Sequence, residues 1–338
     1  MSGNKTIDWI LLARVWAERL RSVDYDGLNI SAYNKQYLCR LLPALPYYMR
    51  IYARCLSQCL RSAVSPPSGI TLVDYGGGCG FLSILAKAAG FGRVIYIDLN
   101  PLSVATVHVL RSETGRGPDV ILQGDSADLV RYCTAQEITP HMLIATDVIE
   151  HVYDLPVFFA GLCTLSPVMQ MMFTTASTPY NPLIKRRLHR FMVGCETGRT
   201  VEPNYFNRRR QFLLDHYPHL TGEALEQWTV HTRGQTYDDM RKALDAGQLP
   251  QPADRYNTCD PETGNWAERI LPVRAYRAFV SPYGYRLTVA KGFYNVRRSN
   301  PLTSFVARII NTLIRCSGSP GLSVSPFLFL HFRRDGKK

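Results

Sequence analysis

Several features are missing from this sequence, and each absence narrows its class. No apolar run approaches the roughly 18 residues of a membrane-spanning helix. Nine cysteines are scattered without a Cys-x-x-Cys pair, which argues against a zinc site and favours free thiols in a reducing compartment. Asp8 comes early and no small-residue cleavage site follows, so we expect no secretory leader and a cytoplasmic protein.

Acidic residues are also comparatively few. The chain has 27 of them against 39 basic residues, a net charge of +12. This excess suits an anionic substrate, a nucleic acid or a membrane surface, and it does not choose among the three. Two basic clusters fall within one segment and favour an anion there: Lys185–Arg187 with Arg190, and Arg208–Arg210. The length of 338 residues, 46% hydrophobic, predicts one large core or one core with an insertion.

The most informative stretch runs from Ile70 to Gly80. An apolar run ends at Asp74, a glycine-rich turn follows, and a helical pattern then continues to Ala89. This order predicts a strand, a tight turn and a helix, with glycines that let a ligand approach the backbone. A second predicted strand, 94–97, ends at Asp98, where an acidic group suits a bidentate contact with a ribose diol.

The glycine spacing distinguishes between the ligands that use such turns. A dinucleotide site requires Gly-x-Gly-x-x-Gly, but Phe81 stands five residues after Gly76. A P-loop ends in Gly-Lys-Ser/Thr, and the first lysine after the glycine turn is Lys87, too far along the chain for that motif. The pattern present is Asp-x-Gly-x-Gly-x-Gly, and in it the sequence resembles the class I S-adenosylmethionine-dependent methyltransferases.

This resemblance implies S-adenosyl-L-methionine as cofactor and assigns roles to residues at the strand ends. The acidic residue and glycines of the turn would line the methionine side: Asp74, Gly76, Gly78 and Gly80. Asp98 would meet the ribose, with Leu99 beside the adenine. The ends of the third and fourth predicted strands would supply the remaining contacts: Asp125 and Ser126 at the adenine amine, and Asp147 near the sulfonium. An N-terminal helix could close over the cofactor with Tyr33 or Tyr37.

Alternating strand and helix patterns predict an α/β fold with a parallel sheet. The resemblance implies a Rossmann-like, seven-stranded class I methyltransferase sheet whose last two strands form an antiparallel edge. We expect an N-terminal helical extension and linker at 1–69, a cofactor-binding core at 70–177, an inserted helical cap or substrate region at 178–265, and the C-terminal part of the sheet at 266–338. Within the last part we expect a helix over 266–279.

A catalytic base is needed if the acceptor is a hydroxyl, because its proton must leave. His151 lies four residues past Asp147 and is the best candidate, although a histidine that only bonds the loop backbone is an equal alternative. The run 147–151 also resembles a loop of the ubiquinone-pathway O-methyltransferases, where Glu-x-x-Glu-His can hold magnesium. Here Asp147 replaces the first Glu, and Leu155 stands where small-RNA 2′-O-methyltransferases have a second His, so metal binding with Glu150 is not favoured.

Polar segments of the predicted cap are candidates for acceptor binding. We expect the stretch 257–269 to form a turn-rich loop leading into a helix, which suits a lid over the reactive end of the cofactor. The residues that we select there are Arg233, Asp260, Trp266 and Arg269. His189 and His231 are alternative bases from the same cap.

The interpretation is methyl transfer from S-adenosylmethionine to an oxygen or nitrogen of a small-molecule or glycan-linked acceptor, including an anionic one. RNA methylation is an alternative, but no aromatic-basic stacking platform stands out. A non-catalytic cofactor-binding module is a second alternative. An apolar stripe within 305–314 would allow peripheral membrane contact, although packing on the sheet explains it more simply. The sequence names neither the acceptor nor the oligomeric state.

Overall fold

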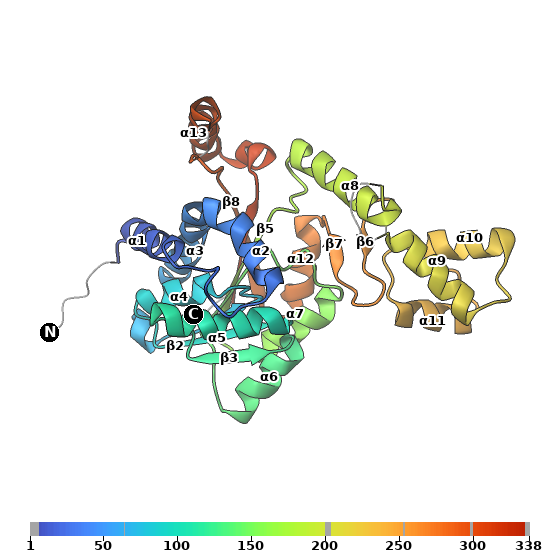
Figure 1. Cartoon of the computed structure of the whole chain (residues 1–338), viewed down its shortest axis with the longest axis horizontal. Coiled ribbons are helices and arrows are strands. Elements are labelled where there is room, and N and C mark those ends of the chain that lie inside the picture. Colours follow the sequence, from blue (N-terminus) through green and yellow to red (C-terminus); the bar gives the residue numbers. More distant parts are fainter. Residues whose placement is uncertain (1–6, 64, 200–203, 253, 298–299, 335–338) are drawn as a thin grey trace.

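The computed structural model describes residues 7–63, 65–199, 204–252, 254–297 and 300–334. Its centre is a seven-stranded sheet in the order β3-β2-β1-β4-β5-β9-β8 (Figure 1). The strands are β1 Thr71–Tyr75, β2 Arg93–Asp98, β3 Val120–Gln123, β4 Met142–Thr146, β5 Gln170–Thr175, β8 Tyr285–Lys291 and β9 Leu328–Arg334. β1 to β5 pair in parallel, whereas β9 is antiparallel to both β5 and β8. This arrangement confirms the predicted fold class.

Helices cover both faces of the sheet because successive strand residues point to opposite sides. In β4, Met142 and Ile144 join one buried cluster, and Leu143 and Ala145 join the other. The first cluster takes in α4 Phe81–Ala88 and α5 Pro101–Thr114. The second takes in α6 Ser126–Ala135, α7 Leu155–Thr164 and α12 Val273–Val280.

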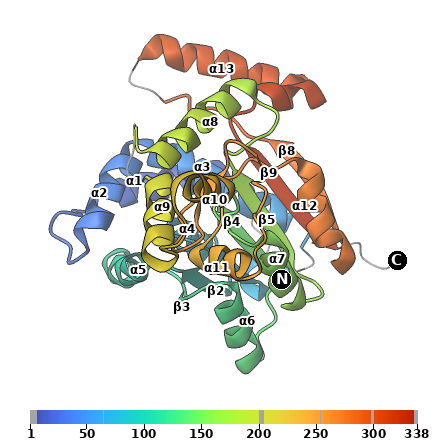
Figure 2. The ribbon, with the colours of Figure 1, turned by 90° about the vertical axis from the view of Figure 1, so that its right-hand side faces the viewer.

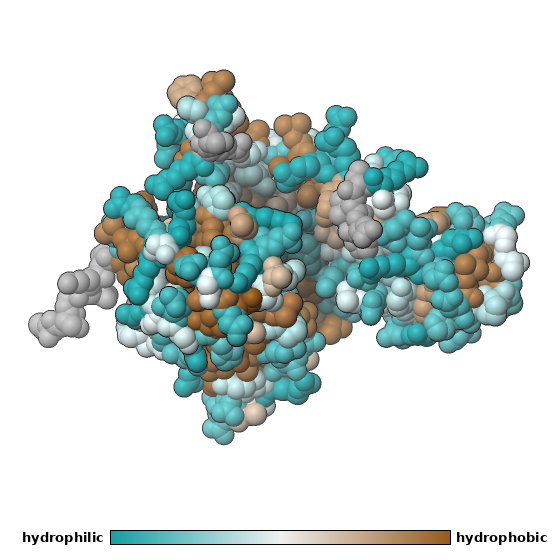
Figure 3. Space-filling view, in the orientation of Figure 1, coloured by the Kyte–Doolittle hydropathy of each residue, from teal (hydrophilic) through white to brown (hydrophobic). Residues whose placement is uncertain are grey.

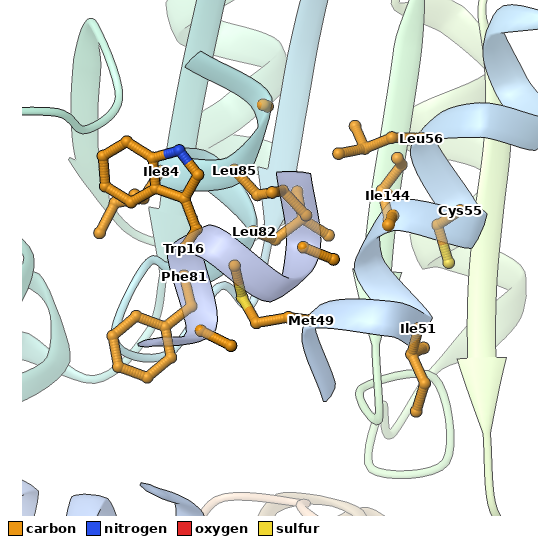
Figure 4. Packing of buried hydrophobic residues seen from close by; sticks show 14 of the residues in the cluster. Trp16, Met49, Ile51, Cys55, Leu56, Phe81, Leu82, Ile84, Leu85 and Ile144 are labelled. Atoms are coloured by element: carbon orange, nitrogen blue, oxygen red, sulfur yellow. The ribbon is translucent and has the colours of Figure 1, made fainter. Parts of the chain in front are cut away.

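The N-terminal helices add a further layer over the first face. They are α1 Trp9–Arg21, α2 Ala32–Leu41 and α3 Leu45–Leu60. Trp16 of α1 and Met49 of α3 lie beside Phe81 of α4, and Leu56 lies beside Ile144 of β4 (Figure 4). Burial of these side chains holds α2 and α3 at the edge where the parallel strands end.

A small helical lobe extends from one end of the molecule (Figure 1). It follows α8 Pro182–Thr197 and contains α9 Tyr205–His216, α10 Gly222–His231 and α11 Tyr237–Asp245. Its own apolar cluster consists of four buried residues: Phe212, Leu213, Leu225 and Met240. We call α9 to α11 the helical lobe.

The helix predicted over 266–279 is wrong in its first half. Trp266–Glu268 is instead β7, which pairs antiparallel with β6 Thr258–Cys259. The hairpin therefore spans the predicted boundary between 178–265 and 266–338. Helix α12 begins only at Val273, because Pro272 cannot donate an intrahelical hydrogen bond and restricts the residue before it to extended backbone.

Helix α13, Pro301–Cys316, lies at the periphery of the fold (Figure 2). The predicted burial of its apolar stripe holds for Ile314 and is wrong for Phe305, Val306, Ile309 and Leu313, which are exposed. Within the described ranges, no helix has both the length and the apolar character needed to cross a membrane.

Candidate active site

A cavity of about 430 Å³ opens at the carboxyl ends of the parallel strands. We call it the strand-end cavity. Its volume falls within the range of pockets that bind small molecules, roughly 300–1,000 Å³. It brings together residues of α2, the glycine turn, the ends of β2 and β4 and the β6–β7 turn, among them Tyr33, Tyr37, Gly76, Gly78, Asp98, Leu99, Asp147, His151 and Asn265.

The glycine turn opens space for a ligand at Gly78. Its φ is +54°, and a Cβ placed there would meet only the Tyr37 hydroxyl oxygen, at 3.8 Å. The Tyr96 hydroxyl donates to the Gly78 carbonyl at 2.7 Å and so holds the turn. Gly76 also has a positive φ, and a Cβ there would overlap Val148 at 2.6 Å. Backbone approach is therefore possible along this side of the cavity.

Asp98 lies at the end of β2, next to this turn. Its carboxylate accepts hydrogen bonds from the backbone N–H groups of Gly78 and Asn100, both at 2.9 Å. Burial nevertheless raises the pKa of Asp98 above its usual value. The carboxylate is thus oriented by backbone at the cavity wall, and Leu99, largely exposed, lies beside it.

Four of the predicted cofactor residues do not line this cavity: Asp74, Gly80, Asp125 and Ser126. The Asp74 carboxylate is buried and accepts hydrogen bonds from the Ser83 backbone N–H at 3.0 Å and hydroxyl at 2.6 Å. Burial raises its pKa to about 7. Asp125 caps α6 through the N–H groups of Ala127 and Asp128. The chain instead presents Gly124 to the cavity at this strand end.

Asp147 occupies a strained position at the end of β4. Its φ is +54°, and among the described residues only Glu137 shares positive φ without being glycine. Such strain costs of order 1–3 kcal/mol and is concentrated at functional sites. Burial first, and then the nearby Glu268, raise the pKa of Asp147 to about 6, while His151 lowers it.

Two further carboxyl groups, Glu150 and Glu268, lie close enough to Asp147 to interact with it electrostatically. Glu150 is buried, its Oε2 has no hydrogen-bond partner within the described structure, and burial together with Asp147 and Glu268 raises its pKa well above the usual value. Glu268, from β7, accepts a short hydrogen bond from the Ser177 hydroxyl. Repulsion between like charges at close range thus adds to burial in raising the pKa of Asp147 and of Glu150.

His151 is held by the backbone of Trp266. Its Nδ1 lies 2.8 Å from the Trp266 carbonyl oxygen, and the Trp266 N–H donates to the His151 carbonyl at 3.2 Å. A carbonyl oxygen can only accept, so the neutral ring must carry its proton on Nδ1. Nε2 is then the nitrogen with a free lone pair, on a residue that lines the cavity.

The predicted metal-binding alternative gains no geometric support. In the part of the chain that the structure describes, no group of three or more His, Cys, Asp or Glu side chains could hold a metal ion. His151 Nδ1 is already engaged with a carbonyl.

A second cavity of about 460 Å³ adjoins the strand-end cavity and shares Tyr37, Gly76, Gly78 and Asp147 with it. It adds Arg40, Tyr48 and Tyr52 from the N-terminal helices. Burial raises the pKa of Tyr52, so this hydroxyl stays protonated. We call this space the tyrosine cavity.

None of the four predicted acceptor-binding residues lines either cavity. Arg233 donates to the carbonyls of Tyr256 and Asn257. Asp260 accepts from the Glu262 N–H and lies 3.4 Å from Arg208. The Trp266 indole N–H and Arg269 both donate to the Tyr153 carbonyl. Each of these side chains holds the hairpin or the lobe in place, because an insertion without a large core needs polar contacts to fix its backbone.

Other residues at the site escaped the sequence patterns. Asn265 and Glu268 reach it from the hairpin, and Tyr48 and Tyr52 from α3. No local motif marks them. Asn265 lies at the cavity because residues 258–268 form a β-hairpin, and the turn of this hairpin contains Asn265.

The structure also forms a stacking platform that no sequence pattern indicated. The His189 and Tyr256 rings lie 3.7 Å apart and 10° from parallel, and the Arg255 guanidinium lies 4.9 Å from the Tyr256 ring. They border a groove of about 630 Å³ whose lining includes Lys185, Arg186, Arg190 and Arg199. Stacked rings and cations thus lie together here, although the sequence showed no such platform.

The sheet itself identifies the fold. Five parallel strands in the order 3-2-1-4-5 are followed by a pair in which the chain's last strand inserts antiparallel beside β5. A glycine-rich turn follows β1, and acidic residues end β2 and β4 at one edge. The chain has the class I methyltransferase fold.

Solved structures of methyltransferases resemble this chain over part or nearly all of its length. A chain from the complex between the Haloferax volcanii Trm112 methyltransferase activator and the putative methyltransferase is 12% identical over 96% of this chain and 98% of its own, with a TM-score of 0.43. An S-adenosylmethionine-dependent methyltransferase from Mesorhizobium loti is 15% identical, covering 82% and 96%, with a TM-score of 0.41.

A ribosomal protein L11 methylase from Lactobacillus delbrueckii subsp. bulgaricus is 16% identical over 41% of this chain and 64% of its own, with a TM-score of 0.29. No protein-family model and no curated protein sequence matches this chain. Because these identities are low, the fold assignment rests on the strand order and the turn.

Proposed function

We propose that this protein is a methyltransferase that uses S-adenosyl-L-methionine and takes a proton from its acceptor with His151. The observation that carries the proposal is the paired hydrogen bonding between His151 and Trp266, which leaves Nε2 as the basic atom of a residue at the strand-end cavity. A histidine that only bonds the loop backbone would explain the Nδ1 contact, but it would not need to line the cavity.

The cavity suits the cofactor that is expected from this fold. Asp98 would accept from the ribose hydroxyls, Leu99 and Gly124 would border the adenine, and Gly76 and Gly78 would border the methionine part. Asp147 would lie near the sulfonium, where a buried carboxylate stabilises positive charge. Tyr33 and Tyr37 line the same cavity from the N-terminal helices and would cover the cofactor.

The bound cofactor would supply an activated methyl group, so the protein mainly aligns the acceptor with it. When an acceptor oxygen takes the methyl group, His151 Nε2 would accept the proton that this oxygen loses. We assign the body of the acceptor to the tyrosine cavity and its reacting atom to the junction at Asp147 and Gly78, because the two cavities share these residues and His151 lines the strand-end cavity. Burial raises the pKa of Glu150, so this carboxyl group ionises less readily beside Asp147 than an exposed glutamate would.

We propose an oxygen or nitrogen of a small-molecule or glycan-linked acceptor as the methylated atom. Arg40 in the tyrosine cavity supports an acceptor with an anionic group. Calorimetry with S-adenosylhomocysteine should show binding. A labelled-methyl screen against small hydroxyl and amine compounds, glycans and RNA should show transfer to a small compound or a glycan and not to RNA. Binding of the cofactor product without transfer to any acceptor would favour a non-catalytic module instead.

RNA methylation is the second candidate, and one observation favours it. The stacked His189 and Tyr256, with the cations of α8 around them, provide both a base-stacking surface and phosphate contacts. Label transfer to RNA alone, lost in a Tyr256→Ala variant that still binds S-adenosylhomocysteine, would establish this candidate over the first.

A further inference from the structure

Helix α13 presents an apolar face to solvent. The residues that it buries are Ser304, Ala307 and Ile314. On the other side, residues spaced by three or four positions form one exposed stripe: Leu302, Phe305, Val306, Ile309 and Leu313. Figure 3 shows hydrophobic residues at the top of the molecule, over this helix.

This exposure is unusual for a globular surface. Leu302 is 68% exposed, Phe305 58% and Leu313 57%. Large contiguous apolar patches are rare on soluble proteins and mark surfaces that contact another molecule or a membrane. The helix contains no acidic residue, and its two charged residues are Arg308 and Arg315. Arg308 and Arg315 lie on one side of the helix, seven residues apart, so a cationic row runs beside the apolar stripe, as in helices that lie in a lipid interface.

A groove of about 900 Å³ lies next to this helix, between α13, α1, α3 and the segment after β8. Six cationic residues line it: Arg50, Arg54, Arg61, Lys291, Arg308 and Arg315. We call it the arginine groove. Its one acidic lining residue, Asp8, uses its carboxylate to cap α1 through the N–H groups of Ile10 and Leu11.

No ion pair forms between these six cations and any carboxylate of the described structure. Arg50 and Arg54 pack their guanidinium groups on the Phe293 ring, and Arg54 also packs on Phe329. Burial lowers the pKa of both arginines, Arg297 adds to the effect on Arg50, and Arg61 adds to that on Arg54. Cations kept half-buried and close together without carboxylates are stabilised when an anion binds among them.

We propose that α13 and the arginine groove dock this protein on the surface of an anionic phospholipid bilayer. The apolar stripe enters the boundary between headgroups and acyl chains, and the cations contact lipid phosphates. A free phosphate ion would satisfy the groove and leave the stripe exposed. A second copy of this chain would cover the stripe, but a two-fold interface would bring the same six cations together from both sides.

Vesicle co-sedimentation with the full chain tests the proposal without reference to catalysis. The protein should bind phosphatidylcholine vesicles that contain phosphatidylglycerol and not vesicles of phosphatidylcholine alone, and salt should weaken binding. The double variant Arg308→Gln/Arg315→Gln should bind about 30-fold more weakly, since each cation near the surface contributes about fivefold. Phe305→Ser/Ile309→Ser should bind at least roughly tenfold more weakly.

The matched control is Val157→Ser/Val168→Ser, which changes two apolar residues of similar exposure, 65% and 64%, away from α13. Its vesicle binding should equal that of the unchanged protein. All these side chains are exposed, so thermal unfolding should show that every variant folds. Equal binding to neutral and anionic vesicles would overturn the proposal. So would a dimer that Phe305→Ser/Ile309→Ser dissociates, in a protein that binds no vesicles.

Discussion

At the scale of single residues, the contact between His151 and Trp266 bears most directly on mechanism. It joins the loop after β4 to the β6–β7 hairpin and determines which ring nitrogen is basic. Two carboxyl groups nearby, Asp147 and Glu150, have pKa values that burial raises. Three predictions concern residues of this cavity.

His151→Ala should lower turnover on a hydroxyl acceptor by roughly 10²–10⁴-fold and leave the affinity for S-adenosylhomocysteine unchanged. The defect should shrink at high pH, where the acceptor loses its proton without help. Steady-state kinetics across pH, with calorimetry, measures both effects. The matched control is His231→Ala, because His231 lies in the lobe with its Nδ1 2.9 Å from the Pro250 carbonyl.

Normal turnover in His151→Ala would remove the base assignment. The unchanged enzyme should also keep its activity in the presence of a chelator. Loss of activity with chelator, restored by magnesium, would show instead that Asp147, Glu150 and His151 hold a metal.

Asp98→Ala should weaken S-adenosylhomocysteine binding by about 1.5–3 kcal/mol, because hydrogen bonds from the ribose to a charged group would be lost. Asp125→Ala is the matched control: it removes a carboxylate at the next strand end that caps α6 and does not line the cavity. Calorimetry should show a change below about 0.7 kcal/mol for the control. Equal losses of affinity in the two variants would show that Asp125 also contacts the cofactor.

Asp147 should make cofactor binding depend on pH. Its pKa of about 6 in the free protein means that the carboxylate is ionised above this pH and protonated below it. A sulfonium favours the ionised form, so affinity for S-adenosylmethionine should rise as pH increases through about 6. S-Adenosylhomocysteine lacks the positive charge and should show a smaller rise. Calorimetry at several pH values on Asp147→Asn should give parallel curves for the two ligands, and persistence of the difference would contradict the assignment.

At the scale of elements, a buried ion pair joins α8 to the helical lobe. Arg209 of α9 is fully buried and donates to both oxygens of Glu196, at 2.6 and 3.2 Å. Glu196 also accepts from Thr258 of β6 at 2.7 Å, and Arg209 donates to the Thr229 carbonyl of α10. Four elements thus meet at one pair, which compensates for the small apolar cluster of the lobe.

Arg209→Met should destabilise the fold by about 3–5 kcal/mol, because it leaves the Glu196 carboxylate buried and unpaired. The double variant Arg209→Met/Glu196→Met is the control and should recover most of the loss. Urea unfolding of the single and double variants measures this coupling. Equal stability of the single variant and the unchanged protein would mean that water replaces the pair.

The ion pair between Glu196 and Arg209 should make the free energy of unfolding decrease as the pH falls. Burial tends to raise the pKa of Glu196, but Arg209 outweighs it, so the pKa in the folded state lies below the usual value of 4.5. The stabilisation is therefore complete above about pH 4.5 and is lost as pH falls through the lower folded value. Acid titration of lobe stability should show this loss in the unchanged protein and not in the double methionine variant.

At the scale of the whole molecule, Tyr153 links the lobe to the sheet. Its hydroxyl donates to Asp239 at 2.6 Å and accepts from the Thr236 N–H at 3.3 Å, while its ring stacks on Trp266. Its carbonyl accepts from Trp266 and Arg269. Tyr153 belongs to the segment that also carries His151, so the position of the lobe is connected to that of the proposed base.

Tyr153→Phe should loosen the lobe without disturbing the cofactor cavity. Loss of a hydrogen bond to a charged group costs about 1.5–3 kcal/mol, so hydrogen exchange in residues 205–245 should become at least about tenfold faster. Affinity for S-adenosylhomocysteine should stay within about threefold, or 0.7 kcal/mol. Tyr237→Phe, which keeps the ring stacked on Phe212, is the control. Unchanged exchange in Tyr153→Phe would show that stacking alone holds the lobe.

Much of the core could be predicted from the sequence because its signals are local. The glycine turn after Asp74, the strand ending at Asp98 and the loop from Asp147 to His151 each lie within a few residues of the strand that positions them. The parallel strand order follows from alternating strand and helix patterns together with the family resemblance. The Trp266 strand was missed because its stability comes from pairing with Thr258 and Cys259 rather than from its own residues.

The strand–turn–helix units, and with them the fold, follow from the sequence alone. The conformational freedom of glycine and the spacing of apolar residues are properties of short segments. Only the tertiary structure decided which nitrogen of His151 is basic, which carboxylates gather around Asp147, and that the α13 stripe faces solvent. These depend on contacts between distant residues, such as the 115 positions that separate His151 from Trp266. Composition and spacing carry no record of such contacts, because they arise when separate segments pack together.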